Sequence, residues 1–203
     1  MSLVIDYVNK NNVQPKSLLD YGAGTGHLAV AFKEKFSIPK VIATDITTNG
    51  MDIELLKKHK VDFSQASQPK DVNEKFDMIL SWAVFHYLDP KQCQEYLSQF
   101  AETLNDNGTL ILGAWSSQDK FFEGQKSKTS ASTGITMYSG NIPEDESEIR
   151  KLGLVTIKRG NLTHKLDDKT QKMMGVPHRL LLRYCFLQKS EMLAKYNHHE
   201  KAD

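Results

Sequence analysis

Between residues 18 and 27 the chain reads Leu18-Leu19-Asp20-Tyr21-Gly22-Ala23-Gly24-Thr25-Gly26-His27. This is an apolar strand that runs into three glycines at alternate positions and then into a helix. Glycines adopt backbone angles that a β-carbon forbids and let a ligand approach the main chain closely. Because the turn opens a helix, its free N–H groups and the positive end of the helix dipole favour an anionic ligand group, such as an amino-acid carboxylate. The stretch therefore predicts a strand, a ligand-binding turn and a helix.

A carboxylate follows the second predicted strand. Residues 41–45 form an apolar run that ends in Asp45, 19 residues after Gly26. At the carboxyl end of the neighbouring parallel strand, an acid can accept both hydroxyls of a ribose that lies over the switch point of the sheet. The alternative role for Asp45 is that of a helix N-cap. Together, the glycine turn and Asp45 favour a nucleoside ligand.

The spacing of the glycines bears on which nucleoside is bound. Nicotinamide-dinucleotide enzymes use the spacing G-x-G-x-x-G after their first strand. Here the third glycine is Gly26, and His27 stands where that spacing needs a glycine, so the spacing is G-x-G-x-G. A dehydrogenase is therefore disfavoured, and a turn that binds no ligand is the simplest alternative.

From residue 17 to residue 115, short apolar runs alternate with helix-like stretches, which is typical of a parallel sheet flanked by helices. Strands are predicted at residues 17–21, 41–45, 61–66, 76–82 and 109–115. Helices are predicted at residues 26–36 and 51–60, and no full helix is expected within 68–75. A further helix begins after Asp89, which can cap it, with Pro90 at its first position, and ends at Asn107-Gly108. Its apolar stripe consists of Cys93, Tyr96, Leu97, Phe100 and Leu104.

The last third of the chain has a different texture. Residues 116–142 are rich in Ser, Gly, Thr and Lys without periodicity, which indicates an irregular loop or cap on the substrate side. A short helix is predicted at residues 144–152, and strands at 154–166 and 179–188. We expect one domain over residues 1–190 and a polar tail over 191–203.

Taken in order, these motifs resemble those of the class I S-adenosylmethionine-dependent methyltransferases, in particular the broad group of methyltransferase domains that act largely on small molecules. The resemblance covers residues 17–115. Residues 20–26 match the family's first motif, and Asp45 matches its ribose-binding acid. Residues 76–81 resemble the fourth-strand motif, and residues 84–88 resemble the segment that follows it. Residues 104–112 resemble the turn into the fifth strand, with Asn107 where the family usually has glycine.

The resemblance implies an α/β fold with a Rossmann-like, doubly wound sheet of seven strands, mostly parallel and ending in a C-terminal antiparallel pair. It implies S-adenosyl-L-methionine as the cofactor and S-adenosyl-L-homocysteine as the product. The adenine-contacting acid that the family often carries after its third strand has no clear match, and Gln65-Ala66 is the nearest candidate. The residues that the resemblance assigns to the donor are Asp20, Tyr21, Gly22, Ala23, Gly24, Gly26, Asp45, Ile46, Gln65, Ala66, Ser81 and Trp82.

Methyl transfer needs a nucleophile aligned behind the methyl group, so positioning alone can lower the barrier by several kcal/mol. If the acceptor must lose a proton, the resemblance places His86 beside the donor, and the intrinsic pKa of histidine suits a general base. The alternative is that His86 only structures the start of the next helix. Trp82, Phe85 and Tyr87 either line the donor pocket or pack in the core. Tyr7, on an opening helix, either covers the donor as a lid or, as we expect, packs in the core.

Composition sets limits on partners and compartment. With 26 basic and 25 acidic residues among 203, the formal net charge of +1 gives no global attraction to nucleic acid or anionic lipid. Lys120, Lys126 and Lys128 are expected to form a solvated surface rather than a nucleic-acid patch. Cys93 and Cys185 fall in separate predicted elements, so we expect no disulfide framework, zinc cluster or other metal site. We expect the protein to be cytoplasmic. No apolar run approaches the roughly 20 residues that a bilayer span needs.

What the sequence lacks narrows the acceptor. Residues 81–84 differ from the Asn/Asp-Pro-Pro-aromatic motif of enzymes that methylate exocyclic amino groups of bases. No carboxylate pair has magnesium-ligand spacing, and no cysteine is placed as a nucleophile for pyrimidine carbons. The leading hypothesis is therefore methyl transfer to a small molecule. A protein or RNA methyltransferase and a non-catalytic nucleoside-binding module of the same fold are the alternatives, and the oligomeric state is left open.

Overall fold

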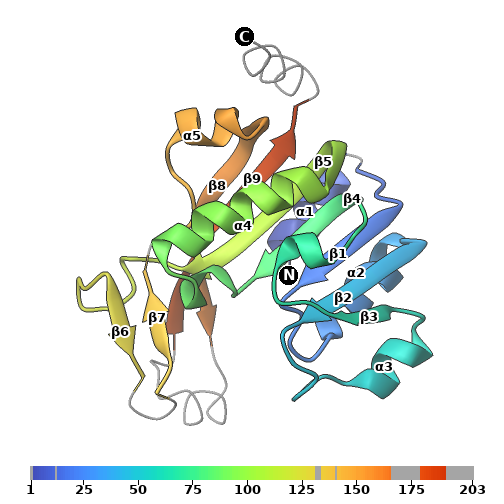
Figure 1. Cartoon of the computed structure of the whole chain (residues 1–203), viewed down its shortest axis with the longest axis horizontal. Coiled ribbons are helices and arrows are strands. Elements are labelled where there is room, and N and C mark those ends of the chain that lie inside the picture. The colour runs from blue at the N-terminus through green and yellow to red at the C-terminus, as the bar shows by residue number, and fades with distance from the viewer. Residues whose placement is uncertain (1, 12, 131–133, 140, 166–178, 191–203) are drawn as a thin grey trace.

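The computed structural model describes residues 2–11, 13–130, 134–139, 141–165 and 179–190. Within these ranges one sheet has seven strands in the order β3-β2-β1-β4-β5-β9-β8 (Figure 1). The strands are β1 (Ser17–Tyr21), β2 (Lys40–Asp45), β3 (Asp62–Gln65), β4 (Phe76–Trp82), β5 (Leu104–Trp115), β8 (Leu154–Lys165) and β9 (Arg179–Lys189). Strands β1 to β5 pair in parallel, and β9 is antiparallel to β5 and β8. The predicted fold class is confirmed.

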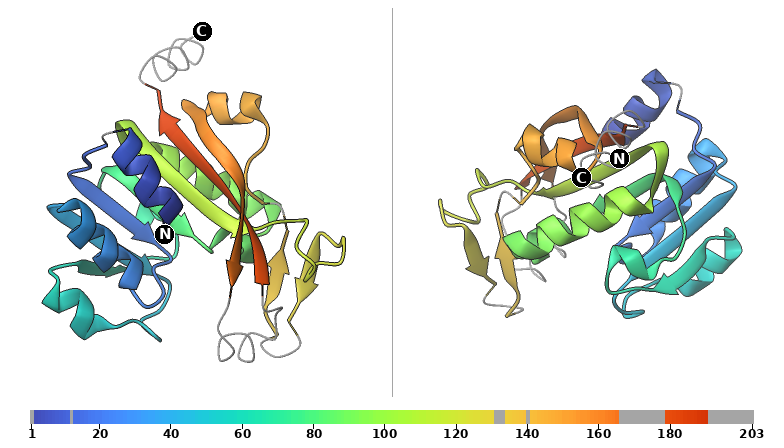
Figure 2. Two further views of the ribbon diagram at one scale, coloured as in Figure 1. Left: turned by 180° about the vertical axis from the view of Figure 1, so that it is seen from behind. Right: turned by 45° about the horizontal axis from the view of Figure 1, so that its top comes forward.

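Helices cover both faces of this sheet (Figure 1, Figure 2). One face carries α1 (Ser2–Lys10), α2 (His27–Phe36) and α3 (Ile53–Lys58), and the other carries α4 (Pro90–Thr103) and α5 (Glu146–Lys151). Successive side chains of a strand point to opposite faces. Leu18 of β1 therefore packs with the first group of helices and Leu19 with the second. The sheet is doubly wound, and the loops that follow β1, β2, β3 and β4 lie at the edge formed by the carboxyl ends of these strands.

Tyr7 on α1 belongs to the core. Its side chain is 6% exposed, and its ring meets Phe186 of β9 edge to face with 4.8 Å between the ring centroids. The expected packing role of Tyr7 is confirmed, and the alternative of a lid over the donor is wrong, because the ring is held against the sheet.

Helix α4 starts as its sequence predicts and ends earlier. The side chain of Asp89 accepts the N–H of Gln92 at 2.9 Å, the side chain of Gln92 accepts the N–H of Asp89 at 2.9 Å, and Pro90 occupies the first turn. Leu104, expected on the helix, is instead the first residue of β5, which was expected to begin at residue 109. The pairing of β4 with β5 shifts register between Phe76 and Met78, so an irregular segment precedes the regular part of β5.

Other boundaries differ from the prediction for local reasons. Helix α3 is shorter than residues 51–60 because Asp52 caps its start through the Leu55 N–H, and Lys60 has a φ of 53°. The strand expected at residues 61–66 covers only Asp62–Gln65, and residues 68–75 hold a single 3-10 turn, η1 (Pro69–Asp71). The expected connection between β8 and β9, from residue 166 onward, and the tail at 191–203 lie outside the described residues.

The segment after β5 contains more regular structure than predicted. A separate antiparallel pair forms from β6 (Ser127–Thr129) and β7 (Thr136–Tyr138). Its two strands are short and polar, and the hydroxyls of Thr129 and Thr136 lie 2.9 Å apart across the pair. Such strands have too little apolar alternation for their sequence to predict them. The expectation of an irregular segment throughout 116–142 is therefore wrong for these six residues.

The reciprocal cap at Asp89 predicts a measurable cost for its removal. Replacing Asp89 with Ala leaves a first-turn N–H of α4 without its partner, which should lower the free energy of unfolding by about 1 kcal/mol. Urea unfolding followed by circular dichroism measures this difference. Lys91→Ala on the same exposed turn is the control and should change stability by less than about 0.5 kcal/mol. Equal stability of the Asp89→Ala variant and the wild-type protein would contradict the role of the cap.

Candidate functional site

The glycine loop between β1 and α2 is fastened to the end of β2. The backbone N–H groups of Gly22 and Ala23 both donate to the carbonyl oxygen of Thr44, at 2.8 Å each. The N–H of Gly24 donates to Oδ2 of Asp45 at 2.9 Å. The glycine turn and the acid, which the sequence predicts separately, are therefore in direct contact.

These contacts correct one expectation. The loop was expected to offer free N–H groups to an anionic ligand group, but those of Gly22, Ala23 and Gly24 are bonded to β2, and that of Gly26 donates to the carbonyl of Ala23 at 2.9 Å. The physical reason is the parallel register of β1 and β2, which brings the last carbonyl and the last side chain of β2 within reach of the loop. A ligand can therefore come close to the main chain of the loop, but it does not find a row of free N–H donors at these glycines.

The three glycines of the loop have different reasons to be glycine, although all three have positive φ. A β-carbon on Gly22 would lie 2.3 Å from Cγ2 of Val84, and one on Gly26 would lie 2.7 Å from Cδ2 of Leu56. A β-carbon on Gly24, by contrast, would meet nothing within 4 Å. Gly22 and Gly26 are therefore required for packing, whereas Gly24 faces open space in which a side chain would stand where a ligand could lie.

Asp45 can still accept hydroxyl groups. Its Oδ2 accepts the Gly24 N–H, and its Oδ1 accepts the N–H of Thr47 at a long 3.4 Å. An ionised carboxylate offers about four lone-pair positions, so two remain for a diol. The N-cap of α3 is Asp52, not Asp45, so the capping alternative for Asp45 is wrong. The next residue, Ile46, has 66% of its surface exposed and presents an apolar surface beside the carboxylate.

The end of β3 is bound to the end of β2. The side-chain amide of Gln65 donates to the carbonyl of Ile46 at 2.9 Å, and the N–H of Ala66 donates to the carbonyl of Asp45 at 3.1 Å. Ala66 is buried. The side-chain amide of Gln65 is thus bonded to the main chain of Ile46, and both candidates for the adenine side are hydrogen-bonded to the backbone at the end of β2.

Tyr21 contributes through its hydroxyl to the same corner. The hydroxyls of Tyr21 and Tyr96 both donate to the carbonyl of Ser67, at 2.9 Å and 2.6 Å. The Tyr21 ring itself is buried beneath α4, edge-on to the ring of Phe100 with 5.2 Å between the centroids. Only the backbone of Tyr21 belongs to the loop, while its side chain holds the segment after β3 in place.

Three buried side-chain atoms of the described residues have no hydrogen-bond partner: Oδ2 of Asp20, Oγ of Ser81 and Nδ1 of His86. Asp20 lies near the carboxyl end of β1, Ser81 lies near that of β4, and His86 follows β4 in η2 (Phe85–Tyr87). Buried polar atoms in folded proteins nearly always have partners. Unpartnered atoms gathered at one edge of a sheet, beside an open glycine, fit a site whose polar ligand supplies the missing contacts.

Burial changes the acidity of Asp20. Desolvation raises the pKa of its carboxyl from 3.8 to about 7, the N–H of Ala29 in α2 opposes this rise, and the negative charge of Asp45 adds to it. A carboxyl in this state ionises readily when a cation comes near it. Asp20 is therefore suited to face a positively charged ligand group.

The turn after β4 closes over the glycine loop. Ala83 has a φ of 64°, an uncommon angle for a residue with a β-carbon, and its N–H donates to the carbonyl of Gly113 at 2.7 Å. Trp82 packs over Gly113, where a β-carbon would lie 2.5 Å from the indole. After this turn Val84 fills the space left by Gly22. Trp82 is only partly buried and touches two of the apolar clusters of the core.

His86 is enclosed by aromatic rings. It is 3% exposed, lies nearly parallel to the indole of Trp115 with 5.1 Å between ring centroids, and meets the ring of Tyr87 at 4.2 Å. Burial lowers the pKa of His86 from 6.5 to about 4, so its imidazole is neutral at neutral pH. Phe85 is fully buried under α4, whereas Tyr87 is 42% exposed. Of these two aromatic residues, Phe85 therefore packs in the core and Tyr87 is exposed.

Two residues that support the site were not predicted from the sequence. The side-chain amide of Asn141 donates to the carbonyls of Leu88 and Phe85, at 2.7 Å and 3.4 Å, and so holds the η2 turn from a distant part of the chain. No local pattern marks such a contact. Asp71 accepts three hydrogen bonds from Ser67 and Gln68, and here a signal existed, since Gln68-Pro69-Lys70-Asp71 has capping-box spacing.

Other candidates lie outside this edge. Lys128 pairs with Glu123 at 3.2 Å and lies over the ring of Phe121, and Lys120 and Lys126 are exposed. Across the described residues, no three His, Cys, Asp or Glu side chains gather in a way that could hold a metal ion. None of the helices in the described ranges combines the length and the apolar character that a membrane span requires.

Comparison with known proteins agrees with this geometry. A family model described as a methyltransferase domain matches residues 1–148. The chain therefore belongs to the methyltransferase domain family, and the expected class I S-adenosylmethionine-dependent methyltransferase fold is confirmed.

Individual relatives differ in what they act on. The chain is 31% identical over 115 residues to a ribosomal protein L11 methyltransferase of Lactobacillus johnsonii, covering 54% of this chain and 35% of that protein. It is 30% identical over 118 residues to a malonyl-[acyl-carrier protein] O-methyltransferase of Halalkalibacterium halodurans, covering 54% and 42%. The chain thus spans less than half the length of these two curated relatives.

A solved structure with a similar fold is that of 1,6-didemethyltoxoflavin-N1-methyltransferase from Burkholderia thailandensis, with bound 1,6-didemethyltoxoflavin and S-adenosylhomocysteine. The TM-score is 0.65 at 17% identity, and the match covers 91% of this chain and 75% of that one. At this level of identity the likeness supports the fold alone.

The open face of Gly24 predicts a selective loss of ligand binding. Gly24→Val should abolish detectable binding of S-adenosylhomocysteine in calorimetry, because the side chain enters the open space, while the protein still folds. Gly124→Val is a matched control, since Gly124 also has positive φ, faces open space and lies outside the loop. Both variants carry backbone strain of roughly 1 kcal/mol. Equal binding by the Gly24 variant and its control would contradict the role given to the loop.

The raised pKa of Asp20 predicts a pH-dependent stability. The folded protein holds the Asp20 proton up to about pH 7, whereas the unfolded chain releases it near pH 3.8. The contribution of Asp20 to the free energy of unfolding should therefore fall as pH rises through this window, by about 1.4 kcal/mol for each pKa unit between the two states. Urea unfolding of wild type and Asp20→Asn over this range measures it.

The difference between those two proteins isolates Asp20 from His86, which titrates in an overlapping range. The Asp20→Asn variant should gain stability relative to wild type as pH rises, while Asp62→Asn, at an exposed position of β3, should follow the wild type. Parallel curves for wild type and Asp20→Asn would show that burial does not shift the Asp20 pKa.

Proposed function

We propose that this protein transfers a methyl group from S-adenosyl-L-methionine to a small-molecule acceptor, releasing S-adenosyl-L-homocysteine. The observation that carries the proposal is the open face of Gly24 beside the Asp45 carboxylate, at the carboxyl edge of a sheet with the methyltransferase strand order. Family membership supports the reaction, and S-adenosylhomocysteine bound to the Burkholderia thailandensis enzyme supports the donor.

The donor site would draw on the ends of four neighbouring strands. Asp45 would accept the ribose hydroxyls with its free lone pairs, and the Gly22–Gly24 backbone would pass beneath the donor. Asp20 faces this loop from β1, and its raised pKa suits a partner that carries an ammonium group. Ile46 would cover the base with its exposed side chain, and Gln65 and Ala66 would border it from β3. Ser81, at the end of β4, offers a buried hydroxyl that lacks a partner.

Bound S-adenosylmethionine would supply an electrophilic sulfonium methyl group. The chain's own contribution is mainly to position the acceptor and exclude water, which can supply much of the rate enhancement for such a displacement. Aromatic residues near His86 would border the acceptor, since Trp115 lies beside His86 and contacts Phe121 and Phe122. Strand β7 also lies against η2. An acceptor held beside these rings would be a small molecule rather than a large surface.

His86 is the group that can take a proton. Its neutral imidazole has a buried, unpartnered Nδ1, so it can accept a hydrogen bond from an O–H or N–H group of the methyl-accepting substrate. Because burial lowers its pKa to about 4, it is a weak base, best matched to an acceptor that is itself acidic. We propose that positioning dominates and that His86 receives the proton where the acceptor has one to lose.

This role predicts a pH profile and a kinetic split. The value of kcat should show no histidine-like change between about pH 5.5 and 8, because His86 is already neutral there. His86→Gln should lower kcat about 100-fold, the low end for loss of a general base, and leave the Kd of S-adenosylhomocysteine within about threefold. Tyr87→Phe keeps the neighbouring ring and is the control. An unchanged kcat in His86→Gln would leave His86 with a packing role only.

Label transfer tests the proposed function itself. The protein is incubated with S-adenosylmethionine labelled in its methyl group and with a cell extract that has been divided by ultrafiltration into a small-molecule and a macromolecular fraction. The proposal expects label in the small-molecule fraction, and expects its loss with Gly24→Val, the variant that should not bind the donor. Absence of transfer to either fraction by protein that binds S-adenosylhomocysteine would favour a non-catalytic nucleoside-binding module.

A protein acceptor is a second candidate because one relative is a ribosomal protein L11 methyltransferase. The same experiment separates the two, since label would then appear in the macromolecular fraction and survive removal of small molecules. Against this candidate, the chain spans only 35% of that relative, and Lys128, in the segment expected on the substrate side, is paired with Glu123.

A further inference from the structure

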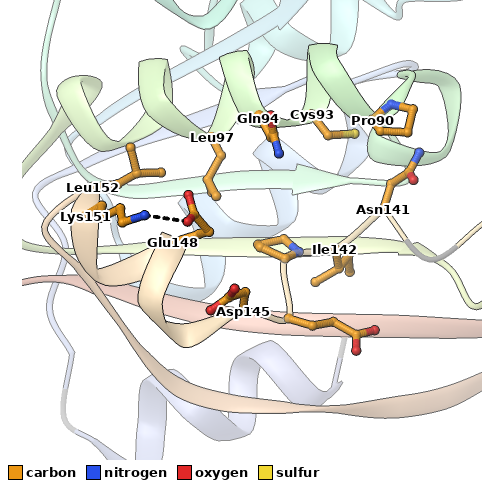
Figure 3. Close-up of a pocket in the computed structure, with 12 residues that line it drawn as sticks. Pro90, Cys93, Gln94, Leu97, Asn141, Ile142, Asp145, Glu148, Lys151 and Leu152 are labelled. Carbon is orange, nitrogen blue, oxygen red and sulfur yellow. Dashed lines mark hydrogen bonds and ion pairs between the residues drawn. The ribbon is translucent and has the colours of Figure 1, made fainter.

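A cavity of about 530 Å³ lies between α4 and α5, on the face of the sheet that α4 covers (Figure 3). Its walls come from the first half of α4, from the chain at residues 141–145 and from α5. None of the residues assigned to the donor site lines it. Its volume is within the range of small-molecule binding sites, which is roughly 300–1,000 Å³.

The apolar part of the lining is extensive. Leu97 and Cys93 of α4 and Ile142 of the opposite wall are buried members of the main core cluster, and Leu152 packs against that cluster. Pro90 and Pro143 add two rigid rings to the walls. A ligand in this cavity could bury an apolar body against side chains that are already fixed.

The walls are held in place by hydrogen bonds. Asn141 on one wall and Cys93 on the other both donate to the carbonyls of Phe85 and Leu88, Asn141 at 3.4 and 2.7 Å and Cys93 at 3.6 and 3.7 Å. These contacts tie the 141–145 segment to the start of α4, so the cavity does not depend on a ligand to form. Small-molecule sites are usually largely preformed in this way.

The charges at the cavity are mostly negative. Glu144, Asp145 and Glu148 line it together with Lys151. Glu148 pairs with Lys151 at 2.6 Å and Glu144 pairs with Arg183, so the net negative charge is that of Asp145. Hydrogen bonds from the N–H and hydroxyl of Ser147 lower the pKa of Asp145, so its charge persists at neutral pH. Figure 3 shows Asp145 and the Glu148–Lys151 pair on the α5 side, opposite Leu97 and Gln94 of α4. The carboxylates thus lie on one side of a space to which both sides contribute apolar side chains.

We propose that this cavity is a second small-molecule site, separate from the donor site, and that it binds an amphipathic organic cation. The apolar body of such a ligand would lie against Leu97, Ile142 and Leu152. Its ammonium group would lie towards Asp145, because Glu144 and Glu148 are already in ion pairs with Arg183 and Lys151. An aryl-alkyl amine is the simplest molecule with this arrangement.

The test uses 2-phenylethylammonium as the probe and 3-phenylpropionate, which has the same ring and the opposite charge, as its counterpart. Ligand-observed NMR titration of the full chain should give one site for the cation with a Kd on the order of 1 mM, as expected for so small a molecule. The anion should bind at least about threefold more weakly, since exposed charges contribute up to about 1 kcal/mol.

Two variants locate the binding. Gln94→Trp places a large ring at an exposed position of the α4 wall and should weaken binding at least about tenfold, a loss of about 1.4 kcal/mol. Asp145→Asn removes one charge but retains a residue that can cap α5, and should weaken binding about threefold. Glu102→Gln, on α4 but outside the cavity, should bind as the wild type does.

Binding of the anion as tightly as the cation, or equal binding by wild type and the Gln94→Trp variant, would overturn the proposal. So would the absence of binding to wild type at probe concentrations well above the expected Kd. Because no methyl donor is present in these titrations, their failure is distinct from a failure of the proposed methyl transfer.

Discussion

The rest of the site depends on the way the loop after β1 is bonded to the end of β2. The N–H groups of Gly22 and Ala23 donate to the carbonyl of Thr44, and that of Gly24 donates to the carboxylate of Asp45, so three hydrogen bonds hold the loop against the end of β2. The bonds require the loop to turn tightly, which is why Gly22, Gly24 and Gly26 all have positive φ. They also direct the Asp45 carboxylate towards Gly24, so that the open glycine and the acid form one surface.

Neighbouring elements follow from this arrangement. The missing β-carbon of Gly22 leaves room for Val84, and the turn before Val84 places Ala83 in the left-handed region. From there the chain enters η2, which buries His86 beside Trp115, and the carbonyls of this turn are bonded by Asn141 from the segment after β7. The burial that accompanies this packing raises the pKa of Asp20 and lowers that of His86. Asp20 therefore ionises when a cation lies near it, whereas His86 is already neutral and able to accept a proton.

Much of the fold and of the donor edge could be predicted because local motifs encode them. The glycine spacing, the strand ending in Asp45 and the Asp89-Pro90 cap each depend on a few adjacent residues. What could not be predicted depends on contacts across the sequence: the loop N–H groups are satisfied by β2, Leu104 pairs with Phe76 instead of extending α4, and Asn141 reaches η2 over more than fifty positions. The short strands β6 and β7 lack the alternation of apolar and polar residues that would predict them.

We propose that the methyl donor lies on the surface formed by Gly24 and Asp45. A crystal structure of the protein with S-adenosylhomocysteine tests it most directly. We expect the ribose hydroxyls to lie on the Asp45 carboxylate, the ligand to pass over Gly24 without a gap, and its amino group to lie on the side of Asp20. Ligand density elsewhere, or a ribose whose hydroxyls do not touch Asp45, would contradict it.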